Sequence, residues 1–140
     1  MKRAVIYLIT MLLLCGCGAN PTEPVSNKTV TFINEVKDAD VWILAETEEN
    51  LKTTLWGKAT VSGIKKDESR KAPLCDAGET GLYILRMIDT DSGFYSADSI
   101  ALEPGWTVRI TEDDLRSVKL EVTDENDVLK NTYEVFAAKL

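Results

Sequence analysis

The sequence predicts an all-β protein whose one folded domain is a small antiparallel β-sandwich of seven to nine short strands. Apolar and polar residues alternate over most segments, and this period of two is typical of strands with one buried face. Clusters of Gly, Pro, Asp, Asn and Ser separate the segments at short intervals, as the turns of a sandwich require. Residues 29–140 suffice for one domain with a real core and are too few for two.

The first half of this domain contains three alternating segments, which predict strands at residues 29–33, 41–45 and 60–64. Helix is scarce, and residues 48–55 are the one longer helical candidate. We therefore expect strands to dominate from the start of the domain.

The second half opens with residues 82–89, which are apolar on nearly both faces and predict a central strand. Residues 89–93 then form a turn into residues 94–96, and this order predicts a β-hairpin. Thr111 could cap a single helical turn through Glu112, Asp113 and Asp114. The remaining predicted strands are residues 99–102, 106–110, 118–122 and 128–136.

The N-terminus carries the pattern of an export signal. Lys2 and Arg3 precede a mostly apolar run of about eleven residues, which is shorter than the roughly twenty that span a bilayer. The run ends in Leu14-Cys15-Gly16-Cys17, which resembles the lipobox of a bacterial lipoprotein signal peptide. The resemblance implies that residues 1–16 are removed and that Cys17 carries a diacylglyceryl group, often with a further chain such as palmitate on the new amino terminus.

Three alternatives to this assignment stay open. Cys15 could be the modified residue, although bulky Leu14 would then stand at the cleavage site. An ordinary secretory signal with an incidental cysteine, or an uncleaved membrane anchor, would also fit the apolar run. Two or three acyl chains would hold the protein on the membrane essentially permanently.

Residues 17–28 then read as the lipidated cysteine and a flexible tether, because Pro, Asn, Thr and Gly prevail over apolar residues. In enteric-type bacteria an aspartate after the cysteine tends to retain a lipoprotein at the inner membrane, and here Gly18 takes that place. We expect a protein of the cell envelope, located at the outer membrane if the host has one.

The composition limits the classes of partner and of chemistry. Removal of Lys2 and Arg3 with the signal leaves 14 basic against 23 acidic residues, a formal charge of −9. This charge disfavours nucleic acid and anionic headgroups, and it serves solubility or a cationic partner. With Cys17 acylated, Cys75 is the one cysteine left, so we expect no internal disulfide, and we interpret Cys75 as a small buried hydrophobe.

The same composition makes an enzyme unexpected. The chain has no histidine, and therefore no serine-histidine-aspartate triad and no usual zinc ligand set. Lys65, Lys66, Arg70 and Lys71 form the only basic cluster, which we interpret as a solvated loop, with a headgroup-binding patch as the alternative.

A second resemblance covers roughly residues 30–115. An asparagine (Asn34) follows the first strand, Trp56-Gly57 form a Trp-Gly pair, and a strand with Tyr83 leads into the aspartate-rich hairpin. This order looks like a group of small exported bacterial β-domains that have no assigned activity. The resemblance implies the fold and adds no chemistry, and Ser92 makes the hairpin one residue longer than the compact pattern.

Two candidate sites follow from residue types. Asp89, Asp91 and Asp98 could bring carboxylate oxygens to a calcium ion, although Ser92 and Ser99 occupy positions where a full calcium loop needs other ligands. The alternative is that these aspartates bond their own backbone in a turn.

Tryptophan supplies the other candidate. Trp56 beside Gly57 could stack on a sugar or a peptide, whereas a core or loop-anchoring role is the alternative that it shares with Trp42 and Trp106.

Two functions of different classes remain. The first is a lipid-anchored, non-enzymatic binding or structural module of the envelope that recognises a protein or glycan through loops at one end, with a calcium-dependent adhesin as a variant. The second is an acidic inhibitor or chaperone-like partner of a cationic envelope protein. We favour the first, without a cofactor and without nucleic acid as a partner.

Overall fold

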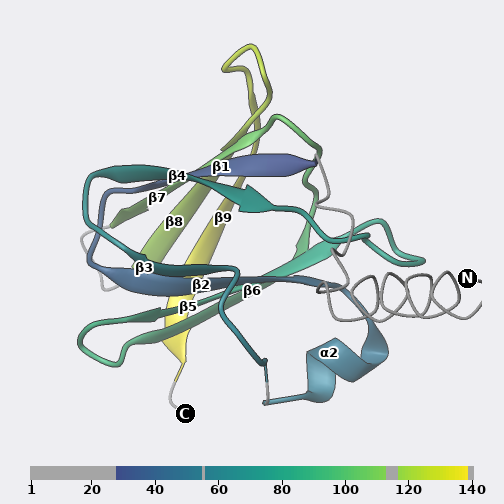
Figure 1. Ribbon diagram of the computed structural model, residues 1–140, viewed down its shortest axis with the longest axis horizontal. Helices are drawn as coiled ribbons and strands as arrows, with labels where there is room; N and C mark the ends of the chain where they lie inside the picture. The colour runs from purple at the N-terminus through teal and green to yellow at the C-terminus, as the bar shows by residue number, and fades with distance from the viewer. Residues whose placement is uncertain (1–27, 55, 113–116, 139–140) are drawn as a thin grey trace, which may run out of the picture.

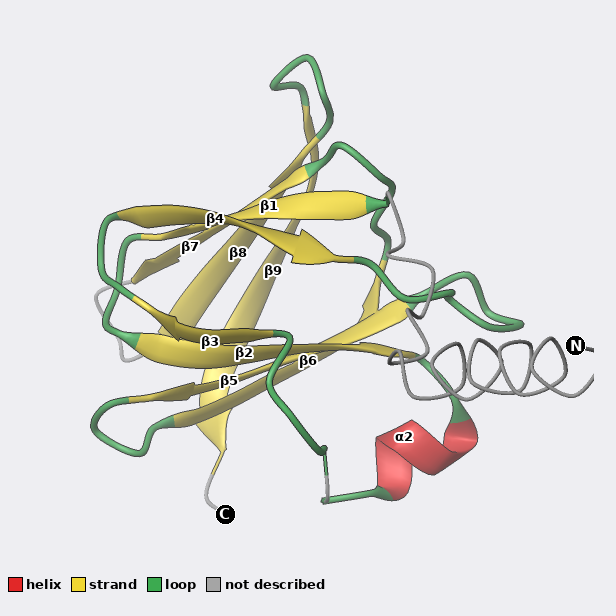
Figure 2. Ribbon diagram, viewed as in Figure 1, coloured by secondary structure: helices red, strands yellow, loops and turns green. Residues whose placement is uncertain are grey.

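The computed structural model describes residues 28–54, 56–112 and 117–138, so the predicted signal peptide, Cys17 and most of the tether lie outside the described residues. The described residues form one short helix, α2 (Glu48–Lys52), and nine strands (Figures 1 and 2). The strands are β1 (Thr29–Asn34), β2 (Ala39–Ala45), β3 (Val61–Ile64), β4 (Glu68–Pro73), β5 (Tyr83–Asp89), β6 (Phe94–Ile100), β7 (Thr107–Glu112), β8 (Ser117–Thr123) and β9 (Leu129–Ala138).

The strands form two layers that share one strand. Their hydrogen-bonded order is β3-β2-β5-β6-β9-β8-β7-β1-β4, and only β1 and β7 pair in parallel. In Figure 1, β4, β1, β7 and β8 make the upper layer, β3, β2, β5 and β6 make the lower layer, and β9 runs from one layer to the other. The predicted all-β sandwich is therefore confirmed.

The core lies between the two layers. β1, β7 and β8 bury every second residue, because their alternating apolar side chains face the other layer while the polar ones face solvent. β5 buries six of its seven residues and lies between β2 and β6, so the predicted central strand is confirmed. The fully buried large side chains include Phe32, Ile64, Ile84, Met87, Ile100, Ile110 and Leu120.

The structure corrects three local expectations. β4 occupies residues for which a loop was expected, since its sequence is almost wholly polar and only Ala72 is buried. β6 continues to Ile100 without the expected break before residue 99, and a bulge with Ser99 at φ 55° accommodates the irregular register. The cap at Thr111 is wrong, because β7 extends through Glu112, while Asp113 and Asp114 lie outside the described residues.

The one described helix is shorter than expected and ends at Lys52. Thr47 caps it, since the backbone N–H of Asn50 donates to the Thr47 hydroxyl at 3.0 Å. No helix in the described part of the chain is long and apolar enough to cross a membrane.

Candidate functional site

The two ends of the sandwich differ in what they hold. The tether meets the domain at Thr29, where β1 begins, and the neighbouring carbonyl of Lys28 accepts the N–H of Leu74 at 2.8 Å. β1 ends at Asn34, and the turns at residues 35–38, 65–67 and 90–93 lie at this opposite end. We call these three turns, with Asn34, the loop end.

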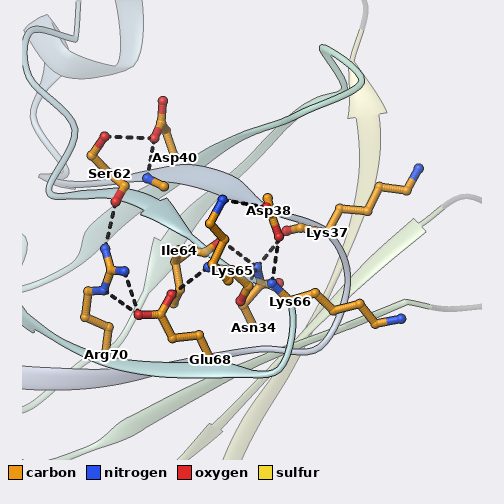
Figure 3. Close-up of polar contacts among 11 residues, drawn as sticks. Asn34, Lys37, Asp38, Asp40, Ser62, Ile64, Lys65, Lys66, Glu68 and Arg70 are labelled. Carbon is orange, nitrogen blue, oxygen red and sulfur yellow. Dashed lines mark hydrogen bonds and ion pairs between the residues drawn. The ribbon is translucent and has the colours of Figure 1, made fainter.

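Asn34 joins two of the turns of the loop end. Its side chain is wholly buried, and Nδ2 donates to the carbonyls of Lys37 at 2.6 Å, Ile64 at 3.2 Å and Lys65 at 3.3 Å (Figure 3). The carboxamide oxygen accepts the N–H of Val36 at 3.1 Å. A buried amide needs such partners, so these bonds fix the turns after β1 and after β3 relative to one another.

Asp38 adds a second link between the same turns. Its carboxylate accepts the backbone N–H of Lys66 at 2.9 Å and the ammonium group of Lys65 at 2.8 Å (Figure 3). The hydrogen bond from Lys65, together with that from the Lys66 backbone, lowers the pKa of Asp38, and Asp38 in turn raises the pKa of Lys65. Both charges therefore persist near neutral pH.

Of the four residues in the basic cluster, Lys65 and Arg70 make ion pairs, whereas the side chains of Lys66 and Lys71 lie on the surface. Besides Lys65, Arg70 is engaged, because its guanidinium group pairs with Glu68 at 2.6 Å and donates to the Ser62 carbonyl at 2.7 Å. Lys66 and Lys71 are exposed. The cluster spans the β3–β4 turn and β4 itself, so the predicted loop accounts for only its first part.

The predicted aspartate site separates into different environments. Asp89 is 6% exposed, and its Oδ1 accepts the N–H groups of Asp91 at 2.9 Å and Gly93 at 2.8 Å. Asp91 pairs with Lys37 at 2.7 Å, which ties this hairpin to the turn after β1. Asp98 stands farther along β6 and is exposed.

Within the described residues, no three acidic or cysteine side chains lie close enough to hold a metal ion. The described geometry gives Asp89 the turn-stabilising role that was the alternative, and calcium binding stays a prediction. Gly93 belongs to the same arrangement, since a Cβ atom there would lie 2.6 Å from Asp89 Oδ2.

A shallow groove of about 180 Å³ opens on the loop end. Asp38, Asp40 and Lys65 contribute its charged groups, and Ile88 and Thr90 contribute further lining. One Asp40 oxygen accepts the Ser62 hydroxyl at 3.1 Å and the Gly63 N–H at 2.6 Å. Such a groove offers carboxylate acceptors to a polar ligand on a surface whose turns are already fixed.

Trp56, the predicted binding residue, is half-buried against the outer face of the lower layer. Its ring stacks on Phe94 with centroids 4.9 Å apart and meets Trp42 edge-on at 5.3 Å. The indole N–H donates to the Thr53 carbonyl at 3.2 Å. These contacts correspond to the loop-anchoring alternative, because the ring holds the segment after α2 against the sheet.

Arg86 completes this cluster and is the residue that the sequence analysis missed. It is 6% exposed, its guanidinium carbon lies 4.8 Å from the Trp56 centroid, and it donates to the carbonyls of Asn50 at 2.9 Å and Thr53 at 3.2 Å. Its Nε has no hydrogen-bond partner among the described residues, and burial lowers the pKa of the side chain. The signal was present, since an arginine interrupts an otherwise apolar strand.

The remaining predicted sites have simpler outcomes. Cys75 is exposed, which corrects the interpretation that it is buried, and partial burial of its sulfur raises the pKa of the thiol. Cys17 lies outside the described residues. Comparisons with protein family models, with curated proteins and with solved structures find no match for this chain.

Proposed function

We propose that this protein is a lipid-anchored lipoprotein of the bacterial cell envelope that works as a non-enzymatic binding module through its loop end. The N-terminal pattern that ends in Leu14-Cys15-Gly16-Cys17 supports export and acylation at Cys17. The tether of residues 18–28 then links the acylated cysteine to the start of β1.

The observation that carries the binding role is the position of the tether relative to the loop end. β1 runs from the tether at Thr29 to the buried Asn34, so the three fixed turns face away from the anchored end. Turns that are already ordered lose little conformational entropy when a partner binds. The partner in this proposal is an envelope protein or a glycan.

The anchor is tested by intact mass and membrane fractionation of the protein from its native host. We expect wild type and Cys15→Ser to carry acyl chains and to partition with the membrane, whereas Cys17→Ser loses both properties. The reverse result for the two variants would assign the anchor to Cys15. A soluble, unmodified wild-type protein would overturn the proposed location.

The binding role is tested by photo-crosslinking in the same host. A crosslinking residue replaces exposed Lys66 at the loop end or, as the matched control, exposed Glu103 near the tether. We expect a defined protein or glycan adduct from position 66 and none from position 103. Equal yields from both positions would contradict the loop end as the binding surface.

A further inference from the structure

Within the described part of the chain, one edge of β9 pairs with no other strand along part of its length. β9 pairs with β8 from Leu129 to Phe136, but it pairs with β6 only at Ala137 and Ala138. Among the described strands, the earlier part of β9 therefore has a neighbour on one side only. We call residues 130–134 of this strand the open edge.

One hydrogen bond shows which backbone groups of the open edge point away from β8. The N–H of Thr132 donates to the side-chain oxygen of its neighbour Asn131 at 2.8 Å and so does not serve the ladder with β8. Alternate residues of a strand direct their backbone groups to opposite sides. The N–H and C=O groups of Thr132 and Glu134 thus face away from β8, and a partner strand would replace the bond from the Thr132 N–H to Asn131.

The side chains around the open edge leave it accessible. Val128 and Leu129 are 52% and 56% exposed, the highest values among the large apolar side chains of the described residues. Lys130, Asn131 and Thr132 are also exposed. In Figure 2 the hairpin between β8 and β9 projects beyond both layers. The chain after β6 contacts β9 where the Ala101 N–H donates to the Tyr133 hydroxyl at 3.2 Å.

The two strands at the ends of the hydrogen-bonded order are protected in ways that the open edge is not. β3 is four residues long and includes Gly63 at φ 59°, and the Ser62 carbonyl already accepts Arg70 at 2.7 Å. β4 carries Lys71 and Pro73. Short length, proline and lysine are the usual protection of an edge. The open edge has no proline, and its lysine, Lys130, is held by Asp124 at 2.8 Å.

Charge selects the kind of chain that fits. Lys119 and Lys130 are already paired with Glu121 and Asp124, each at 2.8 Å. Glu134 is exposed in the open edge, where Lys119 lies opposite it, and Asp127 is exposed in the turn just before the edge. Together with the acidic composition of the domain, these carboxylates leave a negative field there. A second copy of this chain would bring the same negative field, so its approach is opposed.

We infer that the open edge of β9 binds an extended segment of another protein by strand addition, and that this segment carries basic residues. Outward N–H and C=O groups supply the backbone bonds, while Val128, Leu129 and the carboxylates favour alternating apolar and basic side chains. This surface is separate from the loop end, so the inference goes beyond the proposed function and does not depend on it.

The test uses the isotopically labelled native protein and a synthetic nine-residue peptide in which valine and threonine alternate with lysine. Amide hydrogen exchange is followed residue by residue, with and without the peptide. We expect at least tenfold slower exchange at Thr132 and Glu134 with the peptide, weakening as salt is added. A peptide with glutamate in place of lysine should give no slowing.

Two variants distinguish the contribution of the Thr132 backbone N–H to peptide binding from that of its side chain. Thr132→Pro removes an outward N–H without removing a bond to β8, and it should abolish the slowing at Glu134. Thr132→Ala keeps the N–H and should retain the effect. If Thr132→Pro loses the circular dichroism of the fold, the residue-by-residue map of the wild type decides instead.

Three results would overturn the inference. The first is unchanged exchange at Thr132 and Glu134 with the lysine peptide. The second is full binding by a folded Thr132→Pro variant. The third is slow exchange at both amides in the protein alone that grows with concentration and accompanies a dimer in sedimentation, because the occupant would then be a second copy.

Discussion

At the residue scale, several non-glycine residues hold the backbone in a strained conformation. Four non-glycine residues in the described part of the chain have positive φ, and each lies in a turn or at a bulge: Asp67, Ser92, Ser99 and Asp127. Residues other than glycine pay a steric cost in this region of backbone space, smaller for aspartate than for most. Substitution by glycine at any one of these positions should relieve the strain there.

Asp127→Gly should stabilise the domain. Asp127 has φ 60° in the turn between β8 and β9, and glycine adopts this conformation without contact between Cβ and the backbone. Relief of the left-handed strain outweighs the greater unfolded-state entropy of glycine by a small margin, so we expect an increase of about 0.5 kcal/mol in the free energy of unfolding. Urea titration measures it. Glu125→Gly is the control, since Glu125 lies in the same turn without positive φ, and it should destabilise. Equal effects of the two variants would contradict the argument.

Arg86→Met should release the segment that Arg86 holds. The substitution leaves the carbonyl of Asn50 without its Arg86 donor and removes one of the two side-chain donors to the carbonyl of Thr53, although it also removes a buried charge. We expect a net loss of about 2 kcal/mol and faster proteolysis between α2 and β3. Denaturation and limited proteolysis measure the two effects. Arg109→Met, at a more exposed arginine paired with Glu35, should leave the proteolysis rate unchanged.

At the scale of turns and strands, bonds between neighbouring turns hold the loop end in one arrangement. The turns after β1 and β3 touch through Asn34 and Asp38, and the Lys37–Asp91 ion pair adds the hairpin after β5. The buried amide of Asn34 is the strongest of these links, because it serves four backbone groups at once. The exposed ion pair is worth at most about 1 kcal/mol.

Asn34→Ala should therefore loosen two elements together. It leaves buried carbonyls and one N–H without partners, and we expect a loss of about 3 kcal/mol in unfolding free energy. Amide exchange should accelerate in both residues 35–38 and residues 65–67. Asn126→Ala, at an exposed turn position, serves as the control and should cost under about 0.5 kcal/mol. Acceleration confined to one turn would show that Asn34 does not join them.

Elements with a clear alternating or apolar pattern could be predicted from the sequence, and polar ones could not. The pattern is clear in β1, β5, β7 and β8, because burial in the core requires apolar residues at regular positions. β4 could not be predicted, since an edge strand with a single buried alanine has the composition of a loop. The clamp of Arg86 on Trp56 depends on a contact between β5 and the α2–β3 segment, which no local pattern encodes.

The sequence predicts loops at one end of the sandwich but does not identify the turns that form the loop end. Asn34 was recognised as the residue after the first strand, but its three donated bonds require β3 and the turn after β1 to come together. The hairpin at residues 89–93 was predicted correctly, because aspartate and glycine turn signals are local.

At the scale of the whole molecule, carboxylates with lowered pKa link stability to pH. The pKa is lowered at Asp38 by Lys65, at Glu68 by the backbone N–H of Lys65 and by Arg70, and at Asp124 chiefly by Lys130. A lowered folded-state pKa adds stability above the unfolded pKa of about 4, and this stability is lost as pH falls through the folded value.

The melting temperature should therefore fall as pH decreases from about 5 to 3. The double variant Asp38→Asn, Asp124→Asn should melt lower than wild type at pH 7 and show a shallower fall toward pH 3. Calorimetry across this range measures both quantities. Glu79→Gln, at an exposed loop position, should leave the slope as in wild type. A slope that the double variant does not change would assign the acid sensitivity to other groups.

The parallel pairing of β1 with β7 has a consequence for when the protein folds. Thr31 pairs with Thr107, so the upper layer closes only after most of the chain is present. Pairings so distant along the chain make folding slow, because the intervening loop must lose its entropy before the contact forms. The pairing of β1 with β7 cannot form until the residues from Thr107 onward have been synthesised, and the export proposed above requires a chain that is still unfolded when it crosses the membrane.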